Sequence, residues 1–197
     1  MRSRDVLLAV VLAITVAGCA AKNPWISQYP DRPAAGFGQP ISEADLAPWN
    51  IDIRTPDGKG LPFGSGSVGQ GRTIYEAKCA ACHGPEAKGG PVYGTMVGGI
   101  GSFKTNARVL TPGSMYPYAP ILFDYVRRAM PMDRPFTMSA NEVYSVAAYL
   151  LYLNGLVPED AVMDQNSLPN VQMPNRNGFV PDDRPDTKAS RCMKSCN

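Results

Sequence analysis

Two cysteines and a histidine stand together near the middle of the chain, in the order Cys79-Ala80-Ala81-Cys82-His83. In a helical turn the two thiols project toward one edge of a porphyrin, where each can add across a vinyl group. The histidine that follows can supply an imidazole to the porphyrin iron. The spacing C-x-x-C-H therefore predicts covalent attachment of one haem c through Cys79 and Cys82, with His83 as the proximal ligand.

The same pair of cysteines also occurs in thioredoxin-like redox motifs and in half of a zinc site. A thioredoxin-like pair is expected at the end of a strand in a β-α-β unit, and a zinc site needs further Cys or His ligands nearby. The sequence around residues 79–83 has neither feature. We therefore favour haem attachment over these two alternatives.

His83 is the only histidine among the 197 residues. Ligation of the iron by two imidazoles of one chain is therefore excluded by composition. The sixth ligand has to be a methionine, a lysine, a rarer group or nothing.

Glycine and proline contribute 19 residues each, which is more than a compact helical domain uses, so much of the chain is expected to be irregular. The formal net charge of +2 is too close to balance to indicate binding of nucleic acid. From the haem motif and the helices expected around it, the fold class is expected to be an all-α, class I cytochrome c domain, and the glycine and proline content predicts long irregular extensions at both ends.

Residues 1–18 have the features of a lipoprotein signal peptide. A basic start precedes an apolar run of 11 residues over 6–16, which is too short to cross a bilayer of about 30 Å. Small residues then lead to Cys19, as in a bacterial lipobox. The similarity implies export, lipidation of Cys19 and a membrane-anchored domain in the periplasm, and Ala20 favours the outer membrane. The alternative is an ordinary cleaved signal peptide in which Cys19 has no role.

Residues 19–65 are rich in proline and glycine and are expected to form a tether, with one short helical turn at 42–46. Residues 66–157 are expected to form the haem domain. Residues 158–197 are again rich in proline, without periodicity, and are expected to form an irregular extension.

Cys192 and Cys196 stand in this last segment, close enough to form a disulfide in an oxidising compartment. The alternatives are a redox-active pair or half of a metal site.

Two helices are expected to cross within the haem domain. Gly71 and Tyr75 lie one turn apart on one helix face, a spacing that marks the crossing of the first and last helices in small c-type cytochromes. Residues 139–142 form a capping box that begins the last helix, and Gly155 is a natural stop. Tyr149 is the expected aromatic partner at the crossing.

Two prolines mark the surroundings of the haem. Related cytochromes have a proline after the haem motif whose carbonyl accepts the proximal imidazole N–H, and Pro91 matches it, although Gly-Pro is also an ordinary turn. In cytochromes with a distal methionine, this residue precedes a proline in the loop before the last helix. Met130-Pro131 matches that pattern, with Met132 as the second choice, whereas the alternative role of each methionine is to fill the core.

Four stretches together resemble the cytochrome c subunit of SoxD-type sulfur dehydrogenases and related sulfite dehydrogenase cytochromes. They are GKGLPFGSGSVGQGRTIYEAKCAACHGPEAKGGP, YPYAPILFDYVRRAMP, EVYSVAAYLLYLNGLVPEDAVMD and LPNVQMPNRNGFVPDDRPD. In that family the cytochrome accepts electrons from a molybdenum-cofactor dehydrogenase that oxidises sulfane sulfur or sulfite, and passes them to another cytochrome c. The resemblance implies the same haem attachment and proximal ligand as above, with Met130 as the distal ligand.

The chain departs from the family in two ways, since some members carry two haem domains and a soluble periplasmic subunit has no lipobox. A different molybdenum dehydrogenase or a membrane respiratory chain is therefore also an eligible partner. We expect a cytochrome that relays single electrons and has no substrate site of its own. The alternative is a haem enzyme, such as a peroxidase or a thiosulfate-oxidising cytochrome, with a displaceable sixth ligand.

Overall fold

The computed structural model describes residues 40–181, which divide into two units with a boundary at residues 50 and 51. In the first unit, α3 (Glu43–Leu46) begins at Ser42, whose side chain accepts a hydrogen bond from the Asp45 N–H. The short turn predicted at 42–46 is therefore confirmed. Cys19, Cys192, Cys196 and the predicted signal peptide lie outside the described residues.

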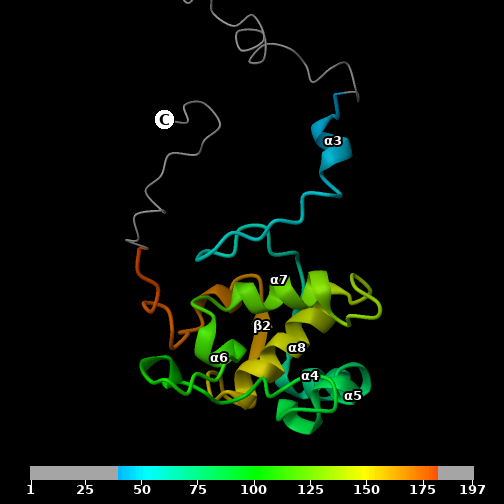
Figure 1. Ribbon diagram of the computed structural model, residues 1–197. Helices are drawn as coiled ribbons and strands as arrows, with labels where there is room; N and C mark the ends of the chain where they lie inside the picture. Colours follow the sequence, from blue (N-terminus) through cyan, green and yellow to red (C-terminus); the bar gives the residue numbers. More distant parts are fainter. Residues whose placement is uncertain (1–39, 182–197) are drawn as a thin grey trace, which may run out of the picture. The chain divides into compact units, whose positions relative to one another are not determined.

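The second unit is mainly helical (Figure 1), as predicted from the sequence. Its elements are, in chain order, β1 (Ser65–Ser67), α4 (Val68–Lys78), α5 (Ala80–His83), η2 (Pro85–Ala87), η3 (Ser102–Lys104), α6 (Pro112–Met115), α7 (Pro120–Ala129), α8 (Ala140–Leu153), β2 (Val162–Asp164) and η4 (Leu168–Asn170). No helix within residues 40–181 is both long enough and apolar enough to cross a membrane.

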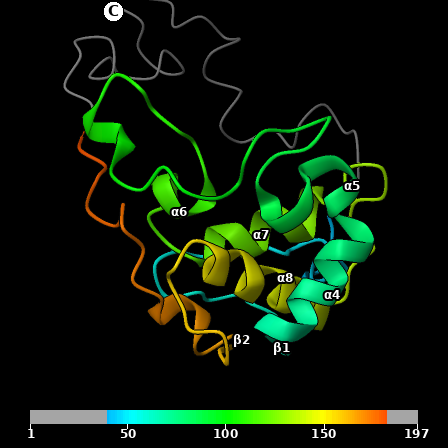
Figure 2. The ribbon, with the colours of Figure 1, turned by 90° about the horizontal axis from the view of Figure 1, so that it is seen from below.

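Helix α8 forms the centre of this unit. Its capping box is complete, because the Ser139 hydroxyl accepts from the Glu142 N–H while the Glu142 carboxylate accepts from the Ser139 N–H. All residues from 143 to 151 are buried, so the helix is covered on every side rather than along one stripe. Helices α4 and α7 and the strand pair supply this cover (Figure 2).

Helices α4 and α8 cross at Gly71, as predicted. A Cβ atom at this glycine would lie 1.9 Å from the Ser145 carbonyl oxygen, so no larger residue fits there without moving a backbone. One turn further on, the rings of Tyr75 and Tyr149 pack with their centroids 5.5 Å apart. The crossing brings the end of α4, and hence the cysteine motif, against the middle of α8.

Helix α7 begins with Pro120 and packs Phe123 against Tyr144 of α8, with ring centroids 4.4 Å apart. Arg128 near its C-terminus donates hydrogen bonds to Asp124 and to the Ile51 carbonyl oxygen. Because α7 is tied to both α8 and the start of the unit, its C-terminal end is held in one place beside the cysteine motif.

The predicted boundaries of the haem domain, 66 and 157, are too narrow. Strands β1 and β2 pair antiparallel with Gly66 opposite Met163, and the segment that follows β2 buries Leu168, Val171 and Met173 in the main core. The compact unit also begins at Ile51, within the predicted tether. These segments contribute single buried residues and three-residue strands, which have no periodicity that a sequence pattern could reveal.

Candidate haem-binding site

The cysteine motif lies where one helix ends and the next begins. Cys79 has non-helical backbone angles between α4 and α5, and the four-residue helix α5 then carries Cys82 and His83. Both thiols are free and line the same cavity. Burial raises the pKa of the Cys79 thiol to about 11, so this side chain is uncharged near neutral pH.

The His83 imidazole also lines this cavity, and its Nδ1 atom is buried without a hydrogen-bond partner among the described residues. Burial lowers the pKa of the ring, so it is neutral near pH 7 and one ring nitrogen has a free lone pair. A buried ring nitrogen without a partner is costly unless something else binds the ring. The site therefore fits a group that the imidazole would ligate.

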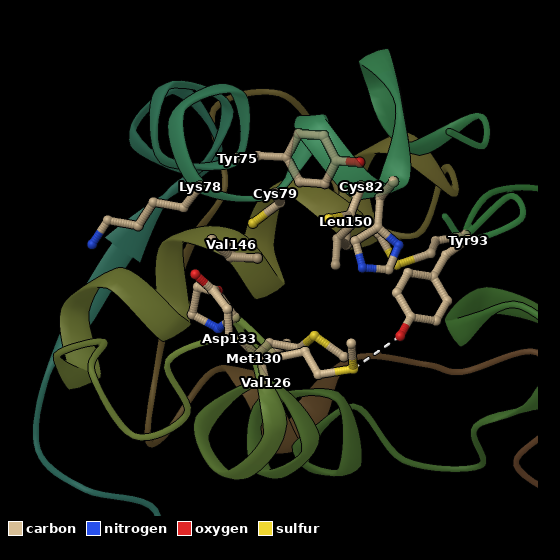
Figure 3. Close-up of a pocket in the computed structure, with 14 residues that line it drawn as sticks. Tyr75, Lys78, Cys79, Cys82, Tyr93, Val126, Met130, Asp133, Val146 and Leu150 are labelled. Atoms are coloured by element: carbon tan, nitrogen blue, oxygen red, sulfur yellow. Dashed lines mark hydrogen bonds between the residues drawn. The ribbon is translucent and has the colours of Figure 1, made fainter. Parts of the chain in front are cut away.

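The cavity lies between the cysteine motif and helices α7 and α8 (Figure 3), and its empty space, including the part open to solvent, is about 700 Å³. Helix α7 supplies Val126, and helix α8 supplies Val146 and Leu150. Apolar walls beside two thiols and an imidazole suit the flat apolar ring of a porphyrin. Zinc is a poor fit, because residues 40–181 contain no group of three His, Cys, Asp or Glu side chains placed to hold a metal ion.

Three methionines line the cavity, namely Met96, Met130 and Met132. Met130 is the C-cap of α7, is half-buried, and its N–H donates to the Val126 carbonyl. Met132 lies two residues further on and is 63% exposed. The structure thus brings both predicted distal candidates to the site and buries the first choice more deeply.

Met96 comes from the loop that follows the cysteine motif. Its position in the cavity wall was not predicted from the sequence. Its N–H donates to the carbonyl of Ala87, only four residues after His83. This backbone contact keeps Met96 with the wall that carries the histidine. Met138, Met163 and Met173 are buried in the core and do not line the cavity.

Glycines allow the loop after His83 to fold back onto the cysteine motif. Gly84 has φ of +75°, and a Cβ atom there would lie 1.9 Å from the Gly89 carbonyl oxygen. A Cβ atom at Gly90 would lie 2.4 Å from the Cys82 carbonyl oxygen. The loop is therefore packed directly against Cys82 and His83, and its next aromatic residue, Tyr93, enters the cavity wall.

The predicted hydrogen bond from His83 to the Pro91 carbonyl is absent. Pro91 is exposed, and the His83 Nδ1 atom has no partner in the described part of the chain. In its place, the Tyr93 ring stacks on the imidazole with centroids 5.1 Å apart and an interplanar angle of 21°. The chain returns to the histidine as predicted, but an aromatic face contacts it instead of a carbonyl.

Two further contacts hold the edges of the site. The Tyr75 hydroxyl donates to the Gly84 carbonyl at 2.9 Å, and burial raises the pKa of this phenol to about 12. Lys78, which lines the cavity, forms an ion pair with Glu142 of α8. Neither Tyr75 nor Lys78 was predicted as a residue of the haem site, although both lie on α4, the helix that leads into the cysteine motif.

Comparison with known proteins places this site in a family. Residues 66–150 match the family model described as cytochrome c oxidase, cbb3-type, subunit III. A search of curated proteins gave no match. A chain in the crystal structure of the sulfane dehydrogenase SoxCD from Paracoccus pantotrophus matches with 37% sequence identity and a TM-score of 0.70. The match covers 82% of each chain.

The chain belongs to the SoxD-type cytochrome c family. As a SoxD-type cytochrome it has the mostly helical cytochrome c fold and carries covalent haem c. The resemblance stated from the sequence motifs is thereby confirmed.

Proposed function

We propose that this SoxD-type cytochrome carries one haem c and relays single electrons. Cys79 and Cys82 hold the haem through thioethers, His83 is the proximal ligand and Met130 is the distal ligand. The observation that supports this best is that two thiols, a neutral imidazole and a half-buried thioether all line one apolar cavity. When bound, haem c supplies a one-electron Fe(III)/Fe(II) couple.

The residues around the site favour the reduced state. A thioether is a weak donor that raises the potential relative to a second imidazole, and Val126, Val146 and Leu150 give the site apolar walls. With His83 and Met130 both bound to the haem, the site would keep no position for a substrate. The haem would then exchange electrons through the open side of the cavity.

The first test is spectroscopic and uses protein produced with haem attachment. We expect one haem per chain, covalent haem staining on a denaturing gel, and the weak long-wavelength visible band that marks methionine bound to Fe(III). Carbon monoxide should bind the reduced protein slowly, because Met130 has to leave first. Rapid binding of carbon monoxide would favour the alternative of a haem enzyme with an open distal position.

We further propose that the electron donor is a molybdenum-cofactor dehydrogenase acting on sulfane sulfur or sulfite, and that another cytochrome c or a respiratory chain is the acceptor. The similarity to a chain of the SoxCD sulfane dehydrogenase supports this choice. Stopped-flow mixing with a dehydrogenase of this class and its substrate should reduce the haem within the turnover time of the dehydrogenase. Failure of such enzymes to reduce it would reject the donor while leaving the relay proposal intact.

The proposed location is the periplasmic side of a bacterial membrane, with the lipid on Cys19 as the anchor and the outer membrane preferred. This proposal depends on the sequence pattern of residues 1–20. Cys19→Ser should move the haem protein from the membrane fraction to the soluble periplasmic fraction. An unchanged membrane fraction would rule out the lipid anchor.

A further inference from the structure

Tyr93 contacts both the histidine and one of the methionines of the haem cavity. Its ring stacks on His83, with centroids 5.1 Å apart, and its hydroxyl donates a hydrogen bond to the Met132 sulfur at 2.9 Å (Figure 3). No other side chain of the described residues makes a hydrogen bond to Met132. One side chain thus connects the segment that carries the proximal ligand with the loop that carries both distal candidates.

The backbone of Tyr93 is fixed relative to the haem attachment motif. Its N–H donates to the Cys82 carbonyl at 3.3 Å, and its own carbonyl accepts from the Gly90 N–H at 2.9 Å. Gly90 is close enough to Cys82 that no side chain fits between them. The position of the Tyr93 hydroxyl is therefore set by the same loop that folds onto the motif.

Met130 and Met132 are chemically equivalent ligands that stand two residues apart and line the same cavity. The chain consequently needs some feature that assigns one of them to the iron. Met130 is held half-buried at the end of α7, whereas the Met132 sulfur is occupied by the Tyr93 hydroxyl. A sulfur held by this hydroxyl has to give up that bond before it can turn toward the iron.

We propose that Tyr93 is a positioning residue that reserves the distal place for Met130 by holding the Met132 sulfur at the rim of the cavity. This inference rests on the proposed axial pair of His83 and Met130. It predicts that Met132 becomes a competent ligand once Met130 is gone and the Tyr93 hydroxyl is removed.

The experiment compares Met130→Leu with the double variant Met130→Leu/Tyr93→Phe. The phenylalanine keeps the ring that stacks on His83 and removes only the hydroxyl. Losing one net hydrogen bond should raise the fraction of ferric haem with the methionine band about three- to tenfold. The proton NMR signal of an iron-bound methionine methyl in the reduced protein should rise with it.

Two controls assign the effect. Adding Met132→Leu to the double variant should abolish the recovered band. Tyr125→Phe, which changes an exposed tyrosine of α7 outside the cavity wall, should have no effect in the Met130→Leu background.

Equal band intensity in Met130→Leu with and without Tyr93→Phe would overturn the role of Tyr93. Full methionine ligation in Met130→Leu alone would also overturn it, because Met132 would then bind despite the hydroxyl. Wild-type protein without the band would instead reject the axial pair itself, so the two failures are distinguishable.

Discussion

Gly71 of α4 lies directly against the Ser145 carbonyl of α8, so that a Cβ atom on the glycine would be 1.9 Å from that oxygen. The contact sets how closely the two helices approach. Since α4 leads into the cysteine motif and α8 forms one wall of the haem cavity, the same contact sets the position of the motif relative to that wall.

Gly71→Ala should force the two helices apart and lower the free energy of unfolding by about 3 kcal/mol or more. Urea unfolding of the haem-loaded protein measures this loss. Gly69→Ala is the matched control on the same helix, because a Cβ atom there meets nothing within 4 Å. It should be neutral or stabilising by up to about 1 kcal/mol, and equal losses in both variants would contradict the role of the crossing.

Glu142 should make stability depend on pH. The hydrogen bond from Lys78, followed by that from the Ser139 backbone, lowers the pKa of this carboxyl below its usual value. The stabilisation is then fully present above the pKa of the unfolded chain, about 4.3, and is lost as the pH falls through the lowered folded value.

Glu142→Gln should therefore cost about 1 kcal/mol at pH 7, and the difference from wild type should shrink as the pH falls below about 4. Urea midpoints measured across this pH range test the expectation. Glu159→Gln removes an ion pair with Arg72 in which the Glu159 side chain is 68% exposed, and it should change stability by less than about 1 kcal/mol. A Glu142→Gln difference that does not vary with pH would contradict the assignment.

Among the buried polar residues, truncation of Asn154 should lower the free energy of unfolding the most. Its amide donates to the carbonyls of Leu150 and Met96, and its Oδ1 atom accepts from the Gly98 N–H. Asn154→Ala leaves the Met96 carbonyl and the Gly98 N–H without partners, whereas the Leu150 carbonyl keeps the backbone N–H of residue 154, and it should cost about 2–3 kcal/mol. Two of these bonds tie the loop that contains Met96 and Gly98 to the C-terminal end of α8. In Asn154→Ala, the backbone amide hydrogens of this loop should therefore exchange faster than in the wild-type protein. Unchanged exchange there would show that the loop does not depend on Asn154.

Haem attachment should depend on the motif cysteines alone. Cys79→Ala combined with Cys82→Ala removes both thioethers, so haem staining on a denaturing gel should disappear. Cys192→Ser, which changes a cysteine outside the motif, should leave the stain unchanged. Staining that survives the double variant would contradict covalent attachment at these two residues.

Local patterns predicted much of the fold and the site. The motif at 79–83, the capping box at 139–142, and the pairing of Gly71 with Tyr75 each depend on residues within one or two helical turns. Their short spacing carries the information, so the sequence predicted the haem site and the crossing of two helices. Met130, predicted as the distal ligand, lines the cavity, and its role as a ligand stays a prediction.

Contacts between distant segments could not be read in the same way. Several contacts depend on how segments far apart in the chain pack together. They are the pairing of Gly66 with Met163, the burial of Leu168 and Met173, and the position of Met96 in the cavity wall. Single buried residues in irregular segments have no period to detect. The stacking of Tyr93 on His83, where a Pro91 carbonyl was expected, is a contact of this kind.

The sequence by itself determined the kind of cofactor and the helices that surround its site, and it predicts the points of attachment, because these depend on residue type and short spacing. Only the tertiary structure decided where the domain begins and ends, which tyrosine faces the proximal histidine, and which methionine sulfur is held at the rim. Those features arise where loops far apart in the chain meet around one cavity, and close packing there selects among residues that are equivalent in sequence.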